Sequence, residues 1–120
     1  MKYHYEDENI KIIIYFPNKK TALLANASVS IRTTTFGFYT TKGFQIWTSS
    51  LFNERLSEQI NITPPKLKYF GYKEITYVED KKDWIELERL IYSAYQFARS
   101  EKERKQNMNT EIINPSDVPI

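Results

Sequence analysis

The alternation of apolar and polar residues in the first half of the chain predicts a β-sheet. Residues 10–16 are β-branched or aromatic and are followed by a Pro-Asn pair, which is typical of a strand that ends in a turn. In residues 25–32, apolar side chains alternate with Asn, Ser and Arg, so one face of the strand is expected to be buried and the other to meet water. Residues 36–47 are again strand-like, with a kink or bulge expected near residues 41–43.

The pattern becomes less regular after this third strand. Residues 48–58 lose the alternation and predict a long loop or a single helical turn. Residues 60–63 predict a short strand that a proline pair stops, because proline cannot donate to a strand ladder. Residues 67–78 predict the last strand, in which Gly71 would allow a bulge.

A helical period replaces the alternation after Asp80. Asp80 stands at an N-cap position and Asp83 lies three residues later, where an acidic side chain completes a capping box. Both acids also suit the positive N-terminal end of a helix dipole. The mixed-charge residues 99–105 are expected to fray into solvent. Apolar side chains recur at helical spacing and predict a stripe that packs on the sheet: Trp84, Leu87, Ile91, Ala94, Tyr95 and Ala98, widened by Leu90 and Phe97.

Together these elements predict an α+β fold, with an antiparallel β-sheet of about five strands followed by one long C-terminal helix. The polar and acidic residues 1–9 are expected to form a flexible lead-in, and residues 10–105 a single domain. Residues 106–120 are rich in Asn and Pro and are expected to form a flexible tail. A chain of 120 residues can build one core of this kind but not two.

The composition argues against several classes of chemistry. The chain has no cysteine and one histidine, His4, so disulfides, zinc sites and Ser-His or Cys-His catalytic pairs are not expected. Three scattered glycines do not make a phosphate-binding loop. We therefore expect no enzyme, no cofactor and no metal. No apolar run approaches the ~20 residues of a membrane span, and no secretory signal stands at the N-terminus, so a cytoplasmic location is expected.

Charge and aromatic rings gather in one part of the sequence. Residues 10–78 contain nine Lys or Arg and three acids, which gives +6, whereas the whole chain is +2. The same segment holds most of the Phe and Tyr residues. A basic sheet that carries flat rings suits nucleic acid, because cations neutralise phosphates and rings stack on bases.

The densest mixture of lysines and rings is at residues 64–73, where three lysines are interleaved with three aromatic residues. The alternative explanation is that one aromatic row is core and that the lysines keep the sheet soluble. With the flanking cations of the third strand and the following loop, the predicted nucleic-acid-binding residues are Lys42, Arg55, Lys66, Lys68, Tyr69, Tyr72 and Lys73.

Three parts of the chain, in this order, carry a family resemblance. They are residues 29–31 with 43–46, residues 62–66, and residues 77–80 leading into 84–88 and 91–95. In these segments the chain resembles the SpoVG family, small bacterial regulators named for sporulation and septation. It departs from that family in an insertion at residues 51–59 and in the tail beyond residue 104.

The resemblance to the SpoVG family implies a fold, an assembly and a function. The fold would be an antiparallel sheet with one C-terminal helix, and the assembly a homodimer. The function would be binding to DNA or RNA without an enzymatic step. Lys66 and Lys68 fall in the segment that resembles the family's proline-basic, nucleic-acid-contacting region.

A second hypothesis is a protein-interaction module with no role in nucleic-acid binding. Its basis is the strand at residues 10–16, which could present an open sheet edge to a partner. The last residues, Asp117, Val118, Pro119 and Ile120, also resemble the C-terminal tip of bacterial single-stranded DNA-binding proteins, which docks partner proteins. A small-ligand-binding or enzymatic domain is a third class, for which the sequence offers no convergent polar constellation.

Overall fold

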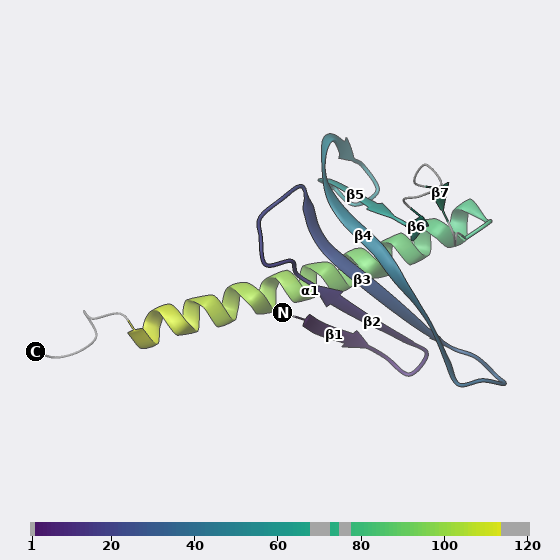
Figure 1. Cartoon of the computed structure of the whole chain (residues 1–120), viewed down its shortest axis with the longest axis horizontal. Helices are drawn as coiled ribbons and strands as arrows, with labels where there is room; N and C mark the ends of the chain where they lie inside the picture. The colour runs from purple at the N-terminus through teal and green to yellow at the C-terminus, as the bar shows by residue number, and fades with distance from the viewer. Residues whose placement is uncertain (1, 68–72, 75–77, 114–120) are drawn as a thin grey trace, which may run out of the picture.

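A computed structural model describes residues 2–67, 73–74 and 78–113 and confirms the predicted α+β fold (Figure 1). Five antiparallel strands form one sheet in the order β1-β2-β3-β4-β5, and a long helix follows. In the described residues, no helix is both long and apolar enough to cross a membrane. The main-sheet strands and the helix are β1 (Lys2–Glu6), β2 (Ile10–Tyr15), β3 (Leu23–Arg32), β4 (Phe38–Asn53), β5 (Glu58–Thr63) and α1 (Lys81–Ile113).

The first strand, β1, corrects the expectation of a flexible lead-in at residues 1–9. Residues 2–6 pair antiparallel with β2, and Tyr3 stands opposite Ile14. Tyr3 is buried, and its ring meets the ring of Phe16 edge-on at a centroid distance of 5.6 Å. The acidic composition concealed a period of two, in which Tyr3 and Tyr5 face the core and the polar residues between them face water.

The core lies between one face of the sheet, here called the inner face, and helix α1. In Figure 1 the helix crosses behind the sheet and extends beyond it toward the C-terminus. Both layers mix small alanines with isoleucine and aromatic side chains, so that the two surfaces interdigitate at close packing. The buried apolar side chains include Ile12, Ile14, Ala25, Ala27, Val29, Phe44, Ile46, Ile60 and Ile62 of the sheet and Ile91, Tyr92, Ala94, Tyr95 and Ala98 of α1.

Strand β4 is longer than the sequence predicted. The loop or helical turn expected at residues 48–58 is wrong for residues 48–53, which continue the strand to Asn53. A tight turn follows, in which the Asn53 side-chain oxygen accepts hydrogen bonds from the backbone N–H groups of Arg55 (3.0 Å) and Leu56 (3.2 Å). This is the local bonding that Asn offers at turns, and it closes the connection to β5.

A β-bulge in β4 lies where the sequence predicted one, near residues 41–43. Ala27 of β3 pairs with Phe44 and Ser28 pairs with Lys42, so Gly43 is the extra residue. Gly43 has a φ of 106°, a backbone conformation that residues other than glycine rarely adopt. Without the extra residue, Lys42 and Phe44 would point to the same face of the sheet. The bulge therefore sends Phe44 into the core and Lys42 to the opposite, outer face.

The predicted last strand at residues 67–78 is wrong as a single strand. The described parts form two short strands, β6 (Lys66–Leu67) and β7 (Lys73–Glu74), which pair antiparallel in a separate ribbon. Gly71 lies outside the described residues.

Helix α1 begins as predicted and ends later than predicted. The Asp80 carboxylate accepts a hydrogen bond from the backbone N–H of Lys82 (2.8 Å), which confirms the N-cap. The apolar stripe is confirmed except at Phe97, which is 45% exposed and whose ring centroid lies 6.0 Å from that of Tyr5. The expected fraying of residues 99–105 is wrong, because the helix continues to Ile113. The domain boundary expected after residue 105 therefore falls inside a helix.

Replacing the bulge glycine tests whether this conformation is required. A Cβ at Gly43 would lie 3.2 Å from Cβ of Pro65, whereas a Cβ at Gly37 (φ 70°) would meet no atom within 4 Å. We expect Gly43→Ala to lower the free energy of unfolding by about 2–3 kcal/mol and Gly37→Ala by about 1 kcal/mol. Urea denaturation followed by circular dichroism measures both. Equal losses would contradict the role assigned to the Pro65 contact.

Candidate nucleic-acid interface

The structure describes four of the seven predicted binding residues, and they lie on β4, on the turn that follows it and on the two strands β6 and β7. Lys42 is exposed on the outer face of β4, whereas Lys66 is exposed in the separate β6–β7 ribbon. In that ribbon Lys73 of β7 stands opposite Leu67. Three of the predicted residues lie outside the described part of the chain: Lys68, Tyr69 and Tyr72.

Arg55, the remaining predicted residue, is bound to an acid of the helix. Its Nε donates to Glu88 Oε1 at 2.8 Å and its terminal nitrogen donates to Oε2 at 3.1 Å. Glu88 is 1% exposed, so its carboxylate needs this bidentate partner. The hydrogen bond from Arg55 to Glu88 raises the pKa of the guanidinium above its ordinary value. The charge of Arg55 is thus used to neutralise a buried acid.

The outer face of the sheet is lined by small hydroxyl side chains between exposed cations. The strand register places Lys11 of β2, Ser30 of β3 and Thr40 of β4 in one row across the outer face. The Ser30 and Thr40 hydroxyls hydrogen-bond each other at 2.6 Å. In the neighbouring row Ser28 stands opposite Lys42. Short side chains in the middle and long cations beside them make a shallow surface with positive borders.

Two cations of the outer face, Lys11 and Arg32, converge on one aromatic ring. Lys11 Nζ lies 4.2 Å from the centroid of the Phe38 ring, and Cζ of Arg32 lies 4.8 Å from the same centroid. The negative face of the ring attracts both cations and offsets their mutual repulsion. Arg32 is also held by a hydrogen bond from its Nε to the carbonyl oxygen of Glu8 at 2.8 Å. We call Lys11, Arg32 and Lys42 the outer-face cation group.

Sequence reasoning found only one member of the outer-face cation group, Lys42. The alternation in residues 25–32 placed Arg32 on the water-facing side of its strand, whereas the pattern of residues 10–16 assigned no face to Lys11. Their neighbours across the sheet depend on strand pairing and register, which the bulge at Gly43 shifts by one residue in β4. One acid shares this face, since Glu6 of β1 stands opposite Lys11.

A second polar network joins β5 to helix α1. Glu58 accepts hydrogen bonds from both terminal nitrogens of Arg99, at 3.0 and 3.2 Å, and from the Tyr92 hydroxyl at 2.6 Å. Hydrogen bonding from Arg99 lowers the pKa of the Glu58 carboxyl, and the same interaction raises the pKa of Arg99. Burial, followed by the bond to Glu58, raises the pKa of the Tyr92 hydroxyl. This network locks the middle of α1 to the end of the sheet.

Beyond Arg99, one edge of the helix carries a row of cations that stack on rings. Arg99 lies over Tyr95 (5.0 Å to the centroid), and Lys102 lies over Phe16 (4.7 Å). One turn later, Lys105 lies over Tyr3 (5.2 Å). The rings contact one another, with centroids 5.6 Å apart for Tyr3–Phe16 and 6.1 Å for Phe16–Tyr95. These contacts help to explain why residues 99–105 do not fray.

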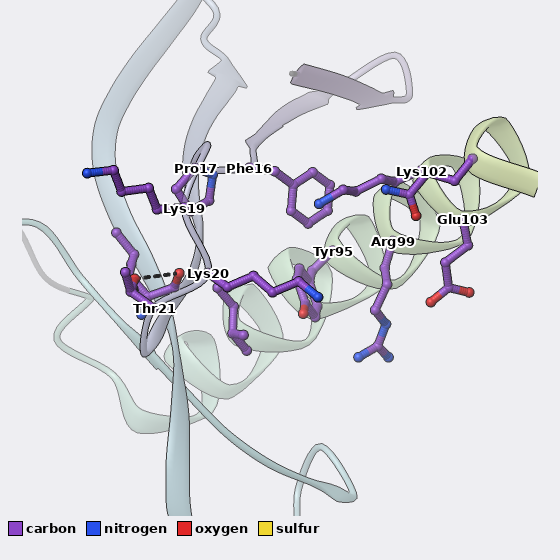
Figure 2. A pocket seen from close by; sticks show the side chains of 12 residues that line it. Phe16, Pro17, Lys19, Lys20, Thr21, Tyr95, Arg99, Lys102 and Glu103 are labelled. Atoms are coloured by element: carbon purple, nitrogen blue, oxygen red, sulfur yellow. Dashed lines mark hydrogen bonds between the residues drawn. The ribbon is translucent and has the colours of Figure 1, made fainter. Parts of the chain in front are cut away.

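A cleft of about 430 Å³ opens between this helix edge and the loop that joins β2 to β3. Figure 2 shows Lys20 of the loop and Lys102 of the helix reaching toward the same opening, beside the rings of Phe16 and Tyr95. The sequence did not predict this site, because its two walls are about 80 residues apart in the chain.

Strand β2, on which the protein-interaction hypothesis depends, is an interior strand of the main sheet. The expectation that residues 10–16 form an exposed sheet edge is wrong, because β2 pairs with β1 on one side and with β3 on the other. The edges of the main sheet are β1 and β5. The proposed docking tip, Asp117, Val118, Pro119 and Ile120, lies outside the described residues.

Comparison with known proteins gives no relative of this chain. No protein-family model, no curated protein and no solved structure matches it. The resemblance to the SpoVG family therefore stays a prediction from the sequence.

The buried acid of α1 provides a test of the role assigned to Arg55. We expect Arg55→Ala to lower the free energy of unfolding by about 2–3 kcal/mol, because the Glu88 carboxylate would remain buried without a partner. Adding Glu88→Leu to this variant removes the buried charge and should restore most of the loss. Urea denaturation of the wild type, Arg55→Ala and the double variant measures the three free energies of unfolding. A double variant as unstable as Arg55→Ala would contradict the assigned pairing.

The Glu58 network predicts an acid-side dependence of stability. The folded-state pKa of Glu58 lies below the ordinary value of 4.5, so the unfolded chain takes up protons more readily as the solution is acidified. The stabilisation is complete above that ordinary value and is lost as the pH falls through the lower, folded-state pKa. Thermal unfolding between about pH 6 and 3 should show a flatter profile for Glu58→Gln. The exposed Glu86→Gln variant should keep the wild-type profile, and a profile unchanged by Glu58→Gln would count against the network.

Proposed function

We propose that this protein binds nucleic acid through the outer face of its main sheet, without a catalytic step. The observation that supports the proposal best is the outer-face cation group, in which Lys11 and Arg32 share the Phe38 ring beside exposed Lys42. Helix α1 packs on the other face of the sheet, so these cations remain open to a large polyanion.

The chemistry of this surface suits a phosphate backbone. Lysine and arginine neutralise phosphates and release condensed counterions, and a hydroxyl such as that of exposed Thr40 also suits a phosphate oxygen, whereas Ser28 and Ser30 are buried. Cations stacked on a ring are positioned without being neutralised, because the ring carries no net charge. Tyr15 and Trp47 add two rings to the same face of the sheet, and stacking on a base contributes roughly 1–3 kcal/mol.

The proposal includes a regulatory or single-strand-binding role of the SpoVG type, in a homodimer located in the cytoplasm.

A specific observation supports a protein interface as a second candidate function. At the end of the β3–β4 hairpin three apolar side chains are exposed: Ile31 (50%), Phe36 (82%) and Tyr39 (70%). Exposed apolar patches on otherwise polar surfaces mark interaction sites. Figure 1 shows this hairpin projecting away from the helix, where a second copy of the chain could cover it.

Neutralising the outer-face cation group tests the proposed function. Fluorescence anisotropy with single- and double-stranded DNA and RNA oligonucleotides would measure the affinity of the triple variant Lys11→Gln, Arg32→Gln, Lys42→Gln. We expect at least a tenfold weaker affinity at low salt. The slope of log affinity against log salt should become shallower by about one for each lost phosphate contact.

The matched control removes the same charge from another surface. Lys81→Gln, Lys82→Gln, Arg89→Gln also lowers the net charge by three, at exposed positions of α1. This control should keep the wild-type salt slope and nearly the wild-type affinity. Equal weakening in both triple variants would assign binding to net charge alone, and no binding by the wild-type protein at low salt would end the proposal. Thermal unfolding of each variant checks that it is folded.

A further inference from the structure

The cleft between the β2–β3 loop and α1 lies apart from the outer-face cation group and has a different construction. Its walls are loop residues 16–24 and the edge of α1 from Tyr95 to Gln106. The loop wall is anchored, because the Ala22 carbonyl oxygen accepts a hydrogen bond from the backbone N–H of Thr48 at 2.8 Å. The Leu23 N–H also donates to the Thr21 hydroxyl at 3.2 Å. The loop therefore holds its side chains against the helix at a fixed place.

The charge of the cleft is positive. Lys19, Lys20 and Lys102 line it together with one carboxylate, that of Glu103. Arg99 also lines the cleft, but its charge is paired with Glu58. The ammonium of Lys102 is held by the Phe16 ring, 4.7 Å from its centroid, and not by an acid. Its position is fixed while its charge stays available to an anion.

Apart from Thr21 and Gln106, the remainder of the lining is apolar or aromatic. Pro17, Leu23 and Leu24 contribute to the loop side and Tyr95 to the helix side. Leu24 packs against the core and Tyr95 is buried, so this part of the wall is rigid. A volume of about 430 Å³ is in the range of sites that hold small organic ligands. Inorganic anions would leave the apolar wall unused.

We propose that this cleft binds a small organic phosphate, with its phosphate groups between Lys20 and Lys102 and its ring or apolar part against Pro17 and Leu24. Nucleoside phosphates belong to this class of ligand. The site uses no residue of the outer-face cation group, so it would operate whether or not the sheet binds nucleic acid. A bound ligand would connect the β2–β3 loop to the helix through its phosphates and would raise the melting temperature of the protein.

The probes separate the phosphate from the organic part. Isothermal titration calorimetry on the full chain at low salt would compare ATP, AMP, adenosine and tripolyphosphate. We expect one saturable ATP site per chain, AMP at least tenfold weaker, and no binding of adenosine. Tripolyphosphate should bind at least fivefold more weakly than ATP. Absence of saturable ATP binding up to about 10 mM, ten times the 1 mM of a weak complex, would overturn the proposal. Tripolyphosphate as tight as ATP would overturn the role of the apolar wall.

Two variants locate the site. Lys20→Gln with Lys102→Gln should weaken ATP binding at least tenfold, whereas the control Lys81→Gln with Lys82→Gln removes the same charge and should not. The triple variant Lys11→Gln, Arg32→Gln, Lys42→Gln should keep ATP binding even if it no longer binds oligonucleotides. ATP binding lost in that triple variant and retained in the cleft variant would move the site to the sheet and overturn this proposal. Failure of oligonucleotide binding alone would remove only the function proposed for the sheet.

Discussion

The burial of one face of the sheet under α1 is the interaction on which the rest of the structure depends. Isoleucines of β2, β4 and β5 and the alanines of β3 have no other apolar surface to pack against, and the helix stripe around Ile91 completes the core. Burial of this kind is the main favourable term in folding. Because the helix covers only the inner face, polar side chains at alternate positions of every strand are left on the outer face. The proposed nucleic-acid surface is a direct consequence of this one-sided packing.

The partners of the cations divide them into two groups. Arg55 and Arg99 are bound by carboxylates that are wholly or partly buried, so their charges stabilise the contact between the sheet and the helix. Lys11, Arg32 and Lys102 are positioned by rings. A carboxylate cancels the charge that it holds, whereas a ring positions a cation and leaves its field in place. Each proposed binding site contains cations of the second group: Lys11 and Arg32 on the sheet, and Lys102 in the cleft.

The sequence predicted secondary-structure elements better than it predicted which side chains meet across the fold. Local signals were enough for the cap at Asp80, the helix stripe and the bulge at Gly43, since each depends on residues close in the chain. The prediction of a flexible lead-in at residues 1–9 was wrong, because the acidic residues there hid the strand-like alternation of Tyr3 and Tyr5 with polar residues. Arg32 could be assigned to a water-facing side, but its meeting with Lys11 at Phe38 depends on register across three strands. The cleft at Lys20 and Lys102 depends on a helix returning to a distant loop, which no local pattern encodes.

The edge strand β1 has a consequence for how the protein behaves at high concentration. An open, positively bordered sheet usually risks recruiting another chain along its unpaired edge. Here the edge strand is five residues long and alternates two tyrosines, turned to the core, with Lys2, His4 and Glu6, which are exposed. A foreign strand docking there would bring its own side chains against this mixed set of charges. The protein can thus keep a broad pleated surface free for a ligand and still resist the edge-to-edge aggregation to which bare sheets are prone.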